Sequence, residues 1–215
     1  MASPKRIFLI RHAESESNVD LNIKKSVPDH RINLTDNGMH QAFDAGLKLY
    51  YLLGDQKVRT YYSPYNRTVQ TYQQIKKTIW DNVVREQQDP RIREQEFGNY
   101  LDPNIESIVT ERDEFGHFFY RVQGGESGAD VFDRVSTFLE SLHRDFRKDD
   151  FPDNCLIVTH GLTLRLFLMR WFHWDYQYFE SLRNPKNASI TIMEKQSSGK
   201  YEITTPMEFW KPKEG

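Results

Sequence analysis

Ile7-Phe8-Leu9-Ile10-Arg11-His12, close to the start of the chain, is the stretch that decides the fold. Its four apolar residues are continuous rather than alternating, which is typical of a central strand buried on both faces. Residues 156–159 form a second run of this kind, and His160 follows it directly. The two runs predict buried strands of one sheet, each ending just before a histidine or an arginine–histidine pair.

Helix-period segments separate the apolar runs, and this alternation predicts an α/β sheet with crossover helices. Thr35-Asp36-Asn37 supplies three capping side chains at the start of one such segment. The apolar residues that follow at helical spacing predict a helix that faces the core. These residues are Met39, Ala42, Phe43, Leu47 and Tyr50.

The same alternation continues toward the C-terminus. Residues 58–62 predict a strand, and Ser63-Pro64 then predicts a helix start, with serine as the N-cap and proline at the first helical position. Ser127-Gly128-Ala129-Asp130 has capping-box spacing ahead of a helix whose apolar residues recur as far as Phe146. The remaining predicted elements are an apolar helix at 162–172 and a terminal hairpin made of 187–194 and 201–205.

The region from about 95 to 123 has weaker periodicity and is interrupted by Gly98, Pro103 and Gly116. It predicts a small, mostly helical inserted cover. We therefore expect a three-layer α/β sandwich, with a mainly parallel central sheet, helices on both faces and this cover. A length of 215 residues fits a single domain over 1–215 that includes the insertion.

The charge and cysteine content exclude several classes of function. A charged fraction of 28% with a net formal charge of -2 gives no electrostatic reason to expect nucleic acid or a membrane surface as a partner. Cys155 is the only cysteine and precedes an apolar run, so we expect a buried hydrophobe. The first apolar stretch is too short for a signal peptide or a membrane span, which predicts a cytoplasmic protein, with a nuclear location also open. The sequence leaves the oligomeric state open.

Cationic side chains follow the predicted strands. Ligands of open α/β sheets bind at the carboxyl ends of the strands, so His12 and His160 are expected at one site. Arg67 falls in the first turn of a helix, where free N–H groups and the helix dipole favour an anion. Arg11 and Arg67 can clamp a phosphoryl group through bidentate hydrogen bonds, while His160 donates to a third oxygen. The sequence therefore predicts a phosphoryl-binding pocket.

A histidine is the expected nucleophile, because the chain has no cysteine motif, no G-x-S-x-G elbow and no D-x-D strand end. Nearby guanidinium groups disfavour the protonated imidazole, which lowers its pKa below about 6.5 and supports attack by His12. The chain also lacks H-E-x-x-H and C-x-x-C spacings. Adjacent arginines would repel a divalent cation, so we expect neither a metal nor another cofactor.

Leu9-Ile10-Arg11-His12-Ala13-Glu14-Ser15, together with Asn18, resembles the opening motif of the histidine phosphatase superfamily, also called the phosphoglycerate-mutase-like family. The resemblance extends in order over nearly the whole chain. Its further motifs are Leu34-Thr35-x-x-Gly38-x-x-Gln41-Ala42, Ser63-Pro64-x-x-Arg67-Thr68, Glu94 to Gly98, Gly124-Gly125-Glu126-Ser127 and Thr159-His160-Gly161. Segments such as Phe118-Phe119-Tyr120-Arg121 are similar to a plant and fungal group whose members are named for their fold more than for a mutase reaction.

The resemblance implies a role for six residues. It makes His12 the phosphohistidine, Arg11, Arg67 and His160 the phosphate pocket, Asn18 a further phosphate contact, and Glu94 the acid that protonates the leaving oxygen. Glu96 competes for the last role, but Glu94 lies four residues before Gly98, as the family's acid does before its glycine. Ala13 stands where glycine is common in the family, and the pocket is expected to tolerate it.

Hydrolysis and mutase chemistry differ in what the cover must do, because a mutase holds its intermediate away from water under a basic covering segment. The cover supplies Arg112, His117 and Arg121 against five acidic residues, which favours a phosphatase acting on a small phosphorylated metabolite or a phosphoprotein. These acids are Asp102, Glu106, Glu111, Asp113 and Glu114. The alternatives are a cofactor-dependent phosphoglycerate mutase and a non-catalytic binding or scaffold protein. The physiological substrate stays open, as do substrate contacts by Arg112, His117, Tyr120 or Arg121.

Overall fold

A six-stranded sheet forms the centre of the computed structural model, which describes residues 3–98 and 105–210. Its strand order is β3-β2-β4-β1-β5-β6. The first four strands in this order pair in parallel, whereas β5 and β6 run antiparallel. The strand bounds are β1 Arg6–Arg11, β2 Val58–Tyr62, β3 Val83–Gln88, β4 Asn154–Thr159, β5 Ile190–Lys195 and β6 Tyr201–Ile203. The predicted mainly parallel sheet is confirmed.

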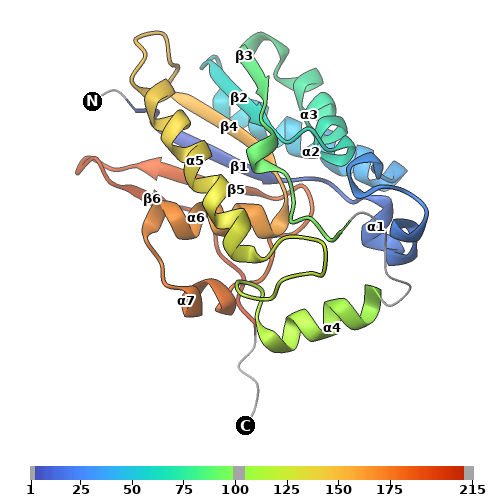
Figure 1. The fold of residues 1–215 in the computed structure, drawn as a ribbon. Coiled ribbons are helices and arrows are strands. Elements are labelled where there is room, and N and C mark those ends of the chain that lie inside the picture. Colours follow the sequence, from blue (N-terminus) through green and yellow to red (C-terminus); the bar gives the residue numbers. More distant parts are fainter. Residues whose placement is uncertain (1–2, 99–104, 211–215) are drawn as a thin grey trace.

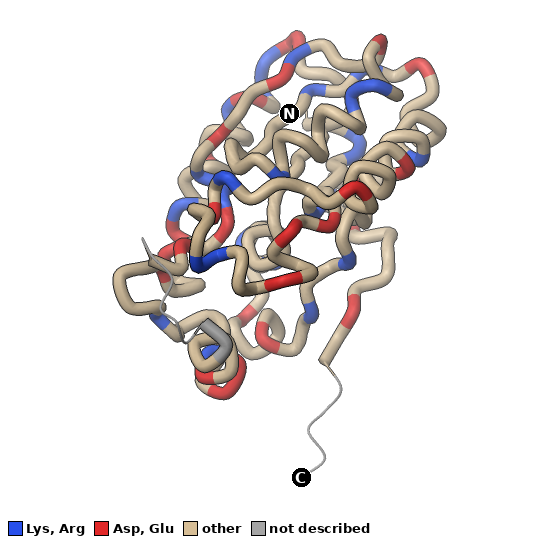
Figure 2. The backbone as a smooth tube through the Cα atoms, turned by 90° about the vertical axis from the view of Figure 1, so that its right-hand side faces the viewer, with Lys and Arg blue, Asp and Glu red and all other residues tan. Residues whose placement is uncertain are grey.

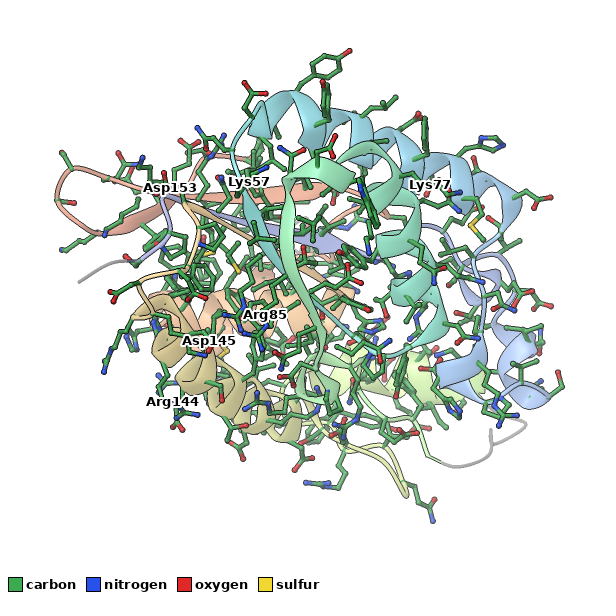
Figure 3. All side chains as sticks on the ribbon, turned by 90° about the horizontal axis from the view of Figure 1, so that it is seen from above. Lys57, Lys77, Arg85, Arg144, Asp145 and Asp153 are labelled. Atoms are coloured by element: carbon green, nitrogen blue, oxygen red, sulfur yellow. The ribbon has the colours of Figure 1, made fainter. Side chains whose placement is uncertain are left out.

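Helices cover both faces of the sheet (Figure 1). Seen from above, α2 and α3 lie on one side of the strands and α5 and α6 on the other, which confirms the three-layer arrangement (Figure 3). The α-helices are α1 Glu16–Val19, α2 Asp36–Leu53, α3 Asn66–Thr78, α4 Ile105–Phe115, α5 Gly128–Phe146, α6 Gly161–Phe172 and α7 Tyr176–Ser181. Short 3-10 helices are η1 Leu21–Lys25, η2 Asp29–Arg31, η3 Trp80–Asn82 and η4 Pro90–Ile92.

Two hydrophobic cores fill the spaces between the layers. Successive residues of a strand point to opposite faces, so Ile7 and Leu9 pack against α5 and α6, whereas Phe8 and Ile10 pack against α2 and α3. All four side chains are fully buried. The continuous apolar run of β1 is therefore the signature of a strand covered on both faces, as the sequence predicts.

Helix α2 begins after the N-cap Thr35 as predicted, and Ala42 is buried as predicted, but three of the five expected core residues are exposed. Phe43, Leu47 and Tyr50 are 39–48% exposed. The helix instead approaches α3 through small residues, and a Cβ on Gly46 would lie 2.5 Å from Thr78 Oγ1. The buried face of α2 combines small residues with Leu49 and Leu53, and it leaves Phe43, Leu47 and Tyr50 outside.

The start of α3 also differs from the prediction. The helix begins at Asn66 with Tyr65 as its N-cap, so Ser63-Pro64 does not cap it. The backbone N–H of Ser63 still donates to Val158 O at 3.1 Å and so continues the strand pairing. Arg67 nevertheless falls in the first turn, as predicted.

The capping box of Ser127 with Asp130 on α5 is confirmed, and so are the helix at α6 and the β5–β6 hairpin. Strand β3 has no apolar signature from which it could be predicted, because its side chains are half-buried or exposed at the sheet edge.

The described part of the predicted cover contains α4, which lies at the same end of the molecule as α1 (Figure 1). Residues 99–104, including Asp102 and Pro103, lie outside the described residues, and so does the side chain of Glu106. Charged residues of both signs are interspersed along the chain rather than gathered on separate faces (Figure 2). Among the described residues, no helix combines the length and the apolar character needed to cross a bilayer.

Candidate active site

The strand register brings the two histidines together. In the parallel pair of β1 and β4, Arg11 lies opposite Thr159, and the next residue of each strand is a histidine. The rings of His12 and His160 meet edge to face, with centroids 5.2 Å apart and an interplanar angle of 62°. Both side chains are buried, with 4% and 0% of their surface exposed.

His12 is held as a neutral imidazole with one free nitrogen. Its Nδ1 lies 2.8 Å from the carbonyl oxygen of Ala13, which can only accept, so Nδ1 carries the proton and Nε2 carries the lone pair. Burial lowers the pKa of His12 well below its ordinary 6.5, and the charges of Arg67 and Arg11 lower it further. The ring is therefore unprotonated at Nε2 at neutral pH and can attack an electrophile.

His160 is bound on one side only. Its Nε2 lies 2.8 Å from the hydroxyl of Ser63, while its buried Nδ1 has no hydrogen-bond partner among the described residues. Burial lowers the pKa of His160 well below 6.5, followed by the effects of Arg67 and His12. A buried polar nitrogen without a partner is costly, so this atom retains an unused hydrogen-bonding capacity.

Each arginine is fixed by an oxygen acceptor. Arg11 Nη1 donates to Pro185 O at 2.7 Å, while its buried Nε lacks a partner among the described residues. Arg67 donates to Asp29 twice, through Nη1 to the backbone carbonyl at 2.7 Å and through Nη2 to Oδ2 at 3.0 Å. Its guanidinium also lies 5.0 Å from the ring centroid of Tyr65. The two groups are oriented before any anion arrives.

The loop after His12 is held by the start of α2. Gln41 Oε1 accepts from the backbone N–H of Glu14 at 3.0 Å, and the hydroxyl of Thr35 donates to Glu14 Oε1 at 2.7 Å. Gly38 permits this close approach, because a Cβ there would lie 2.0 Å from the carbonyl oxygen of Glu14. The motif Leu34-Thr35-x-x-Gly38-x-x-Gln41 therefore positions the segment that carries His12.

A cavity of about 270 Å³ opens above these groups. It combines segments from both ends of the chain with α4. Its lining residues are Arg11, His12, Ser17, Asn18, Leu21, Lys24, Arg67, Glu94, Gln95, Phe97, Val109, Arg112, Leu162, Arg165 and Asn184. Of the six residues predicted for the site, the cavity wall thus contains all but His160, whose ring is in edge-to-face contact with that of His12.

Glu94 and Glu96 are separated by the structure. Glu94 lines the cavity and accepts from the hydroxyl of Thr163 at 3.1 Å, whereas Glu96 does not line it and lies 3.5 Å from the hydroxyl of Tyr65. The backbone that carries Glu94 is held by Arg134, whose guanidinium donates to the carbonyl oxygens of residues 91, 93 and 94. The structure therefore places Glu94, and not Glu96, in the cavity wall.

Asn18 lies at the rim of the cavity and is exposed. Its Oδ1 accepts from the backbone N–H of Ser15 and from Asn187 Nδ2, both at 3.0 Å. With the oxygen used in this way, the amide nitrogen is the part of the side chain suited to an anion.

The four cover residues considered as substrate contacts differ in their position relative to the cavity. Arg112 lines the cavity. His117 instead contacts Glu180 and Asp113, Tyr120 donates to Glu111, and Arg121 pairs with Asp130; none of these three lines the cavity.

Four residues that line or support the cavity were not predicted from the sequence: Lys24, Asp29, Arg165 and Asn184. Arg165 did leave a signal, because it is a single arginine within the first turns of a helix that is apolar nearly all round. Lys24 and Asp29 gave none, since they sit in a polar loop that looks like ordinary surface.

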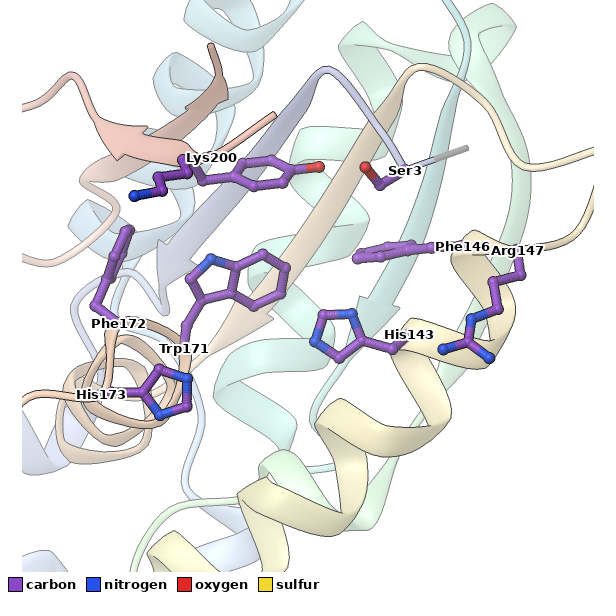
Figure 4. Close-up of a pocket in the computed structure, with 9 residues that line it drawn as sticks. Ser3, His143, Phe146, Arg147, Trp171, Phe172, His173 and Lys200 are labelled. Atoms are coloured by element: carbon purple, nitrogen blue, oxygen red, sulfur yellow. The ribbon is translucent and has the colours of Figure 1, made fainter. Parts of the chain in front are cut away.

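A larger hollow of about 670 Å³ lies elsewhere (Figure 4). The rings of His143, Phe146 and Trp171 surround it, and Ser3, just before β1, also lines it. This places the hollow at the amino ends of the parallel strands, opposite to the histidine pair. Its size does not make it the better candidate. Its described lining residues include His143, His173 and Arg147 but no carboxylate.

Comparison with known proteins gives a consistent result. A family model described as histidine phosphatase superfamily (branch 1) matches residues 7–205. The phosphoglycerate mutase-like protein AT74 of Arabidopsis thaliana is 44% identical over 214 residues, covering 93% of this chain and 68% of the relative. The broad-range acid phosphatase DET1 of Saccharomyces cerevisiae is 31% identical over 309 residues, covering all of this chain and 92% of the relative.

Solved structures show the same fold at lower identity. The structure titled mycobacterial hydrolase 1 aligns with a TM-score of 0.74 at 20% identity, covering 96% of this chain and 99% of that one.

Proposed function

Since the chain belongs to the histidine phosphatase superfamily, branch 1, we propose that it hydrolyses phosphomonoesters through a phosphohistidine formed on His12. The family and its phosphatase relatives support a phosphatase in general terms. The observation that carries the specific proposal is the hydrogen bond from His12 Nδ1 to Ala13 O, which leaves Nε2 as a nucleophile beside a cationic cavity.

In the first step, His12 Nε2 forms a bond to phosphorus while the bond from phosphorus to the ester oxygen breaks. Charge on the transferring group is stabilised by Arg11 and Arg67, and the unpartnered Nδ1 of His160 donates to a phosphoryl oxygen. Fixed donors of this kind are worth most in a buried site, where no water has to reorganise during reaction.

Glu94 completes both steps as an acid and then a base. It gives its proton to the departing ester oxygen, and it later accepts a proton from the water that attacks phosphohistidine. Attack by this water breaks the bond between phosphorus and His12 and releases inorganic phosphate. Its place in the cavity wall, together with the hydroxyl of Thr163 on one carboxylate oxygen, supports this assignment.

The test is hydrolysis of an aryl phosphate in the presence of a chelator. Wild type should release phosphate, and His12→Ala should lose nearly all of this activity while keeping its fold by circular dichroism. Rapid quenching of the wild type should trap an acid-labile, alkali-stable phosphoprotein that His12→Ala lacks. Full activity in His12→Ala would overturn the proposal, and a folded wild type without turnover on a broad panel of phosphomonoesters would favour a binding protein.

A cofactor-dependent phosphoglycerate mutase is the second candidate, because the cavity wall is more basic than the cover sequence suggested. It contains Arg112 and Arg165 in addition to Arg11 and Arg67. Incubation with 3-phosphoglycerate and catalytic 2,3-bisphosphoglycerate separates the two reactions. A phosphatase releases phosphate, whereas a mutase yields 2-phosphoglycerate with little phosphate released.

A further inference from the structure

We propose that Arg112 and Arg165, supported by Lys24, form a second anion subsite in the cavity, and that the substrate carries a carboxylate or second phosphate besides its transferring phosphoryl group. This inference rests on the proposed function, since it names the substrate class of the same site. It goes beyond the transfer chemistry because none of the three residues is needed for attack by His12.

The first support for this subsite comes from the buried side chain of Arg165. Its side chain is 1% exposed, yet it lines the cavity and forms no salt bridge with a carboxylate of the described residues. Nη1 donates to Leu182 O at 2.6 Å, and the buried Nε has no partner within the described chain. Burial lowers the pKa of Arg165 to about 10, so it remains charged at neutral pH. A buried cation without an anionic partner is costly, and an incoming anion would relieve that cost.

The second support for this subsite comes from Arg112, a residue of the cover. Its buried Nε has no partner among described atoms, its Nη1 donates to Gln95 at 3.3 Å, and its nearest carboxylate, that of Asp113, is 3.9 Å away. The guanidinium packs against the ring of Phe97 at 5.3 Å from the centroid. The ammonium group of Lys24 lies 4.7 Å from the same centroid, so both cations contact the ring of Phe97.

The described side chains along the cavity wall carry an excess of positive charge. Five cationic side chains line the wall, with Glu94 as the only carboxylate among the described lining residues; the cations are Arg11, Lys24, Arg67, Arg112 and Arg165. Asp29 pairs with Lys24 and Arg67. A phosphoryl dianion held by Arg11 and Arg67 leaves Arg165 without a salt-bridge partner among the described residues, and leaves Arg112 with only the exposed Asp113 at 3.9 Å.

The orientation of side chains around α4 explains why the charges in the cover sequence did not predict this subsite. Arg112 turns toward the cavity, whereas Glu111, Asp113 and Glu114 on the same helix are exposed and do not line it. Counting charges along α4 gives an acidic segment, but the face that meets the substrate is basic.

Binding of non-hydrolysable phosphonates tests the subsite directly. Calorimetry should compare ω-carboxyalkyl phosphonates with ω-hydroxyalkyl phosphonates of equal length, from two to six carbons, so that only the second anion differs. Wild type should bind the carboxylate form at least about tenfold more tightly at the best length, as expected for charge-assisted hydrogen bonds. Arg112→Met and Arg165→Met should each reduce that preference severalfold and leave the hydroxyalkyl affinity within about twofold.

Arg121→Met is the matched control, because Arg121 is also a cover arginine but pairs with Asp130 away from the cavity. It should keep the wild-type preference. Arg112→Met keeps the subsite testable if loss of the buried Arg165 prevents folding. Equal affinity for both series at every length, or an unchanged preference in Arg112→Met, would overturn the subsite.

Turnover of the corresponding phosphate esters separates this inference from the proposed function. Hydrolysis without any carboxylate preference would leave the phosphatase standing and reject the subsite. Preferential phosphonate binding without hydrolysis of either ester would keep the subsite and reject the phosphatase.

Discussion

Asp29 accepts two hydrogen bonds from Arg67, one at 2.7 Å through its backbone carbonyl and one at 3.0 Å through Oδ2. The carboxylate also pairs with Lys24 at 3.2 Å through Oδ1. A residue of the η2 turn therefore fixes the side chain of α3 that faces the proposed phosphoryl site. The arrangement orients Arg67 at the cost of two of its five donors.

Asp29→Asn should destabilise the fold in a pH-dependent way. Arg67 and Lys24 outweigh desolvation and lower the pKa of Asp29 from 3.8 to about 2. A carboxyl group whose pKa is lower in the folded than in the unfolded protein stabilises the fold at pH values above its unfolded-state pKa. This stabilisation is lost as the pH falls through its folded-state pKa. Asp29→Asn should therefore cost about 2 kcal/mol at pH 7, and the difference from wild type should shrink below about pH 4. Urea unfolding at several pH values measures it, with Asp44→Asn on exposed α2 expected to show no such trend.

Arg11→Met should move the acidic limb of the pH profile. Burial, Arg67 and Arg11 hold the pKa of His12 below 6.5, so protonation reduces kcat/KM only at low pH. Removing one guanidinium raises that pKa and shifts the limb to higher pH, while overall activity falls. Nitrogen NMR of the imidazole should show the same shift. Arg144→Met on the outer side of α5 should leave the limb in place, and an unmoved limb in Arg11→Met would contradict the electrostatic account (Figure 3).

Gly38→Ala should damage activity more than stability alone explains. The added Cβ would lie 2.0 Å from Glu14 O and push away the loop that follows His12. We expect kcat to fall at least about tenfold, since small displacements of a nucleophile are costly. Gly46→Ala on the same helix is the control, because its Cβ meets Thr78 instead. It should lose about 1–3 kcal/mol of stability but retain kcat per folded molecule.

Arg134→Met should impair the acid step through the position of Glu94. Arg134 holds the carbonyl oxygens of residues 91, 93 and 94 and also pairs with Glu126 at 3.0 Å. We expect kcat to fall roughly a hundredfold with little change in KM, and the basic limb of the kcat profile to change. Arg134→Lys should recover part of the loss. A fall in thermal stability with kcat unchanged would show a purely structural role.

The sequence was informative wherever burial on two faces left an apolar run. β1, β2 and β4 could be placed because their residues face two cores, whereas β3 could not, because an exposed edge strand has no apolar signature. On α2, Ala42 is buried as predicted, but Phe43, Leu47 and Tyr50 are exposed. Close packing against α3 requires the small Gly46 at the helix contact, while Leu49 and Leu53 supply the large buried side chains of α2.

The site was predictable where residues follow strands and unpredictable where loops and helices supply its walls. His12, Arg11 and His160 could be brought together by sheet topology, because parallel strands end at one edge. Asp29 and Lys24 contribute through the path of a polar loop, which no periodicity describes. Arg112 depends on which way one helix is rotated, and a charge count along the sequence carries no such information.

The central place of β1 in the sheet affects how the protein acquires its shape. This strand is synthesised before the other strands of the sheet, but both of its hydrogen-bonding neighbours, β4 and β5, belong to the last third of the given sequence. Its contact order is therefore high, and slow folding is expected. A nascent chain that stops before Asn154 has two open edges on β1 and lacks the second histidine, so any premature stop there yields an aggregation-prone, inert product.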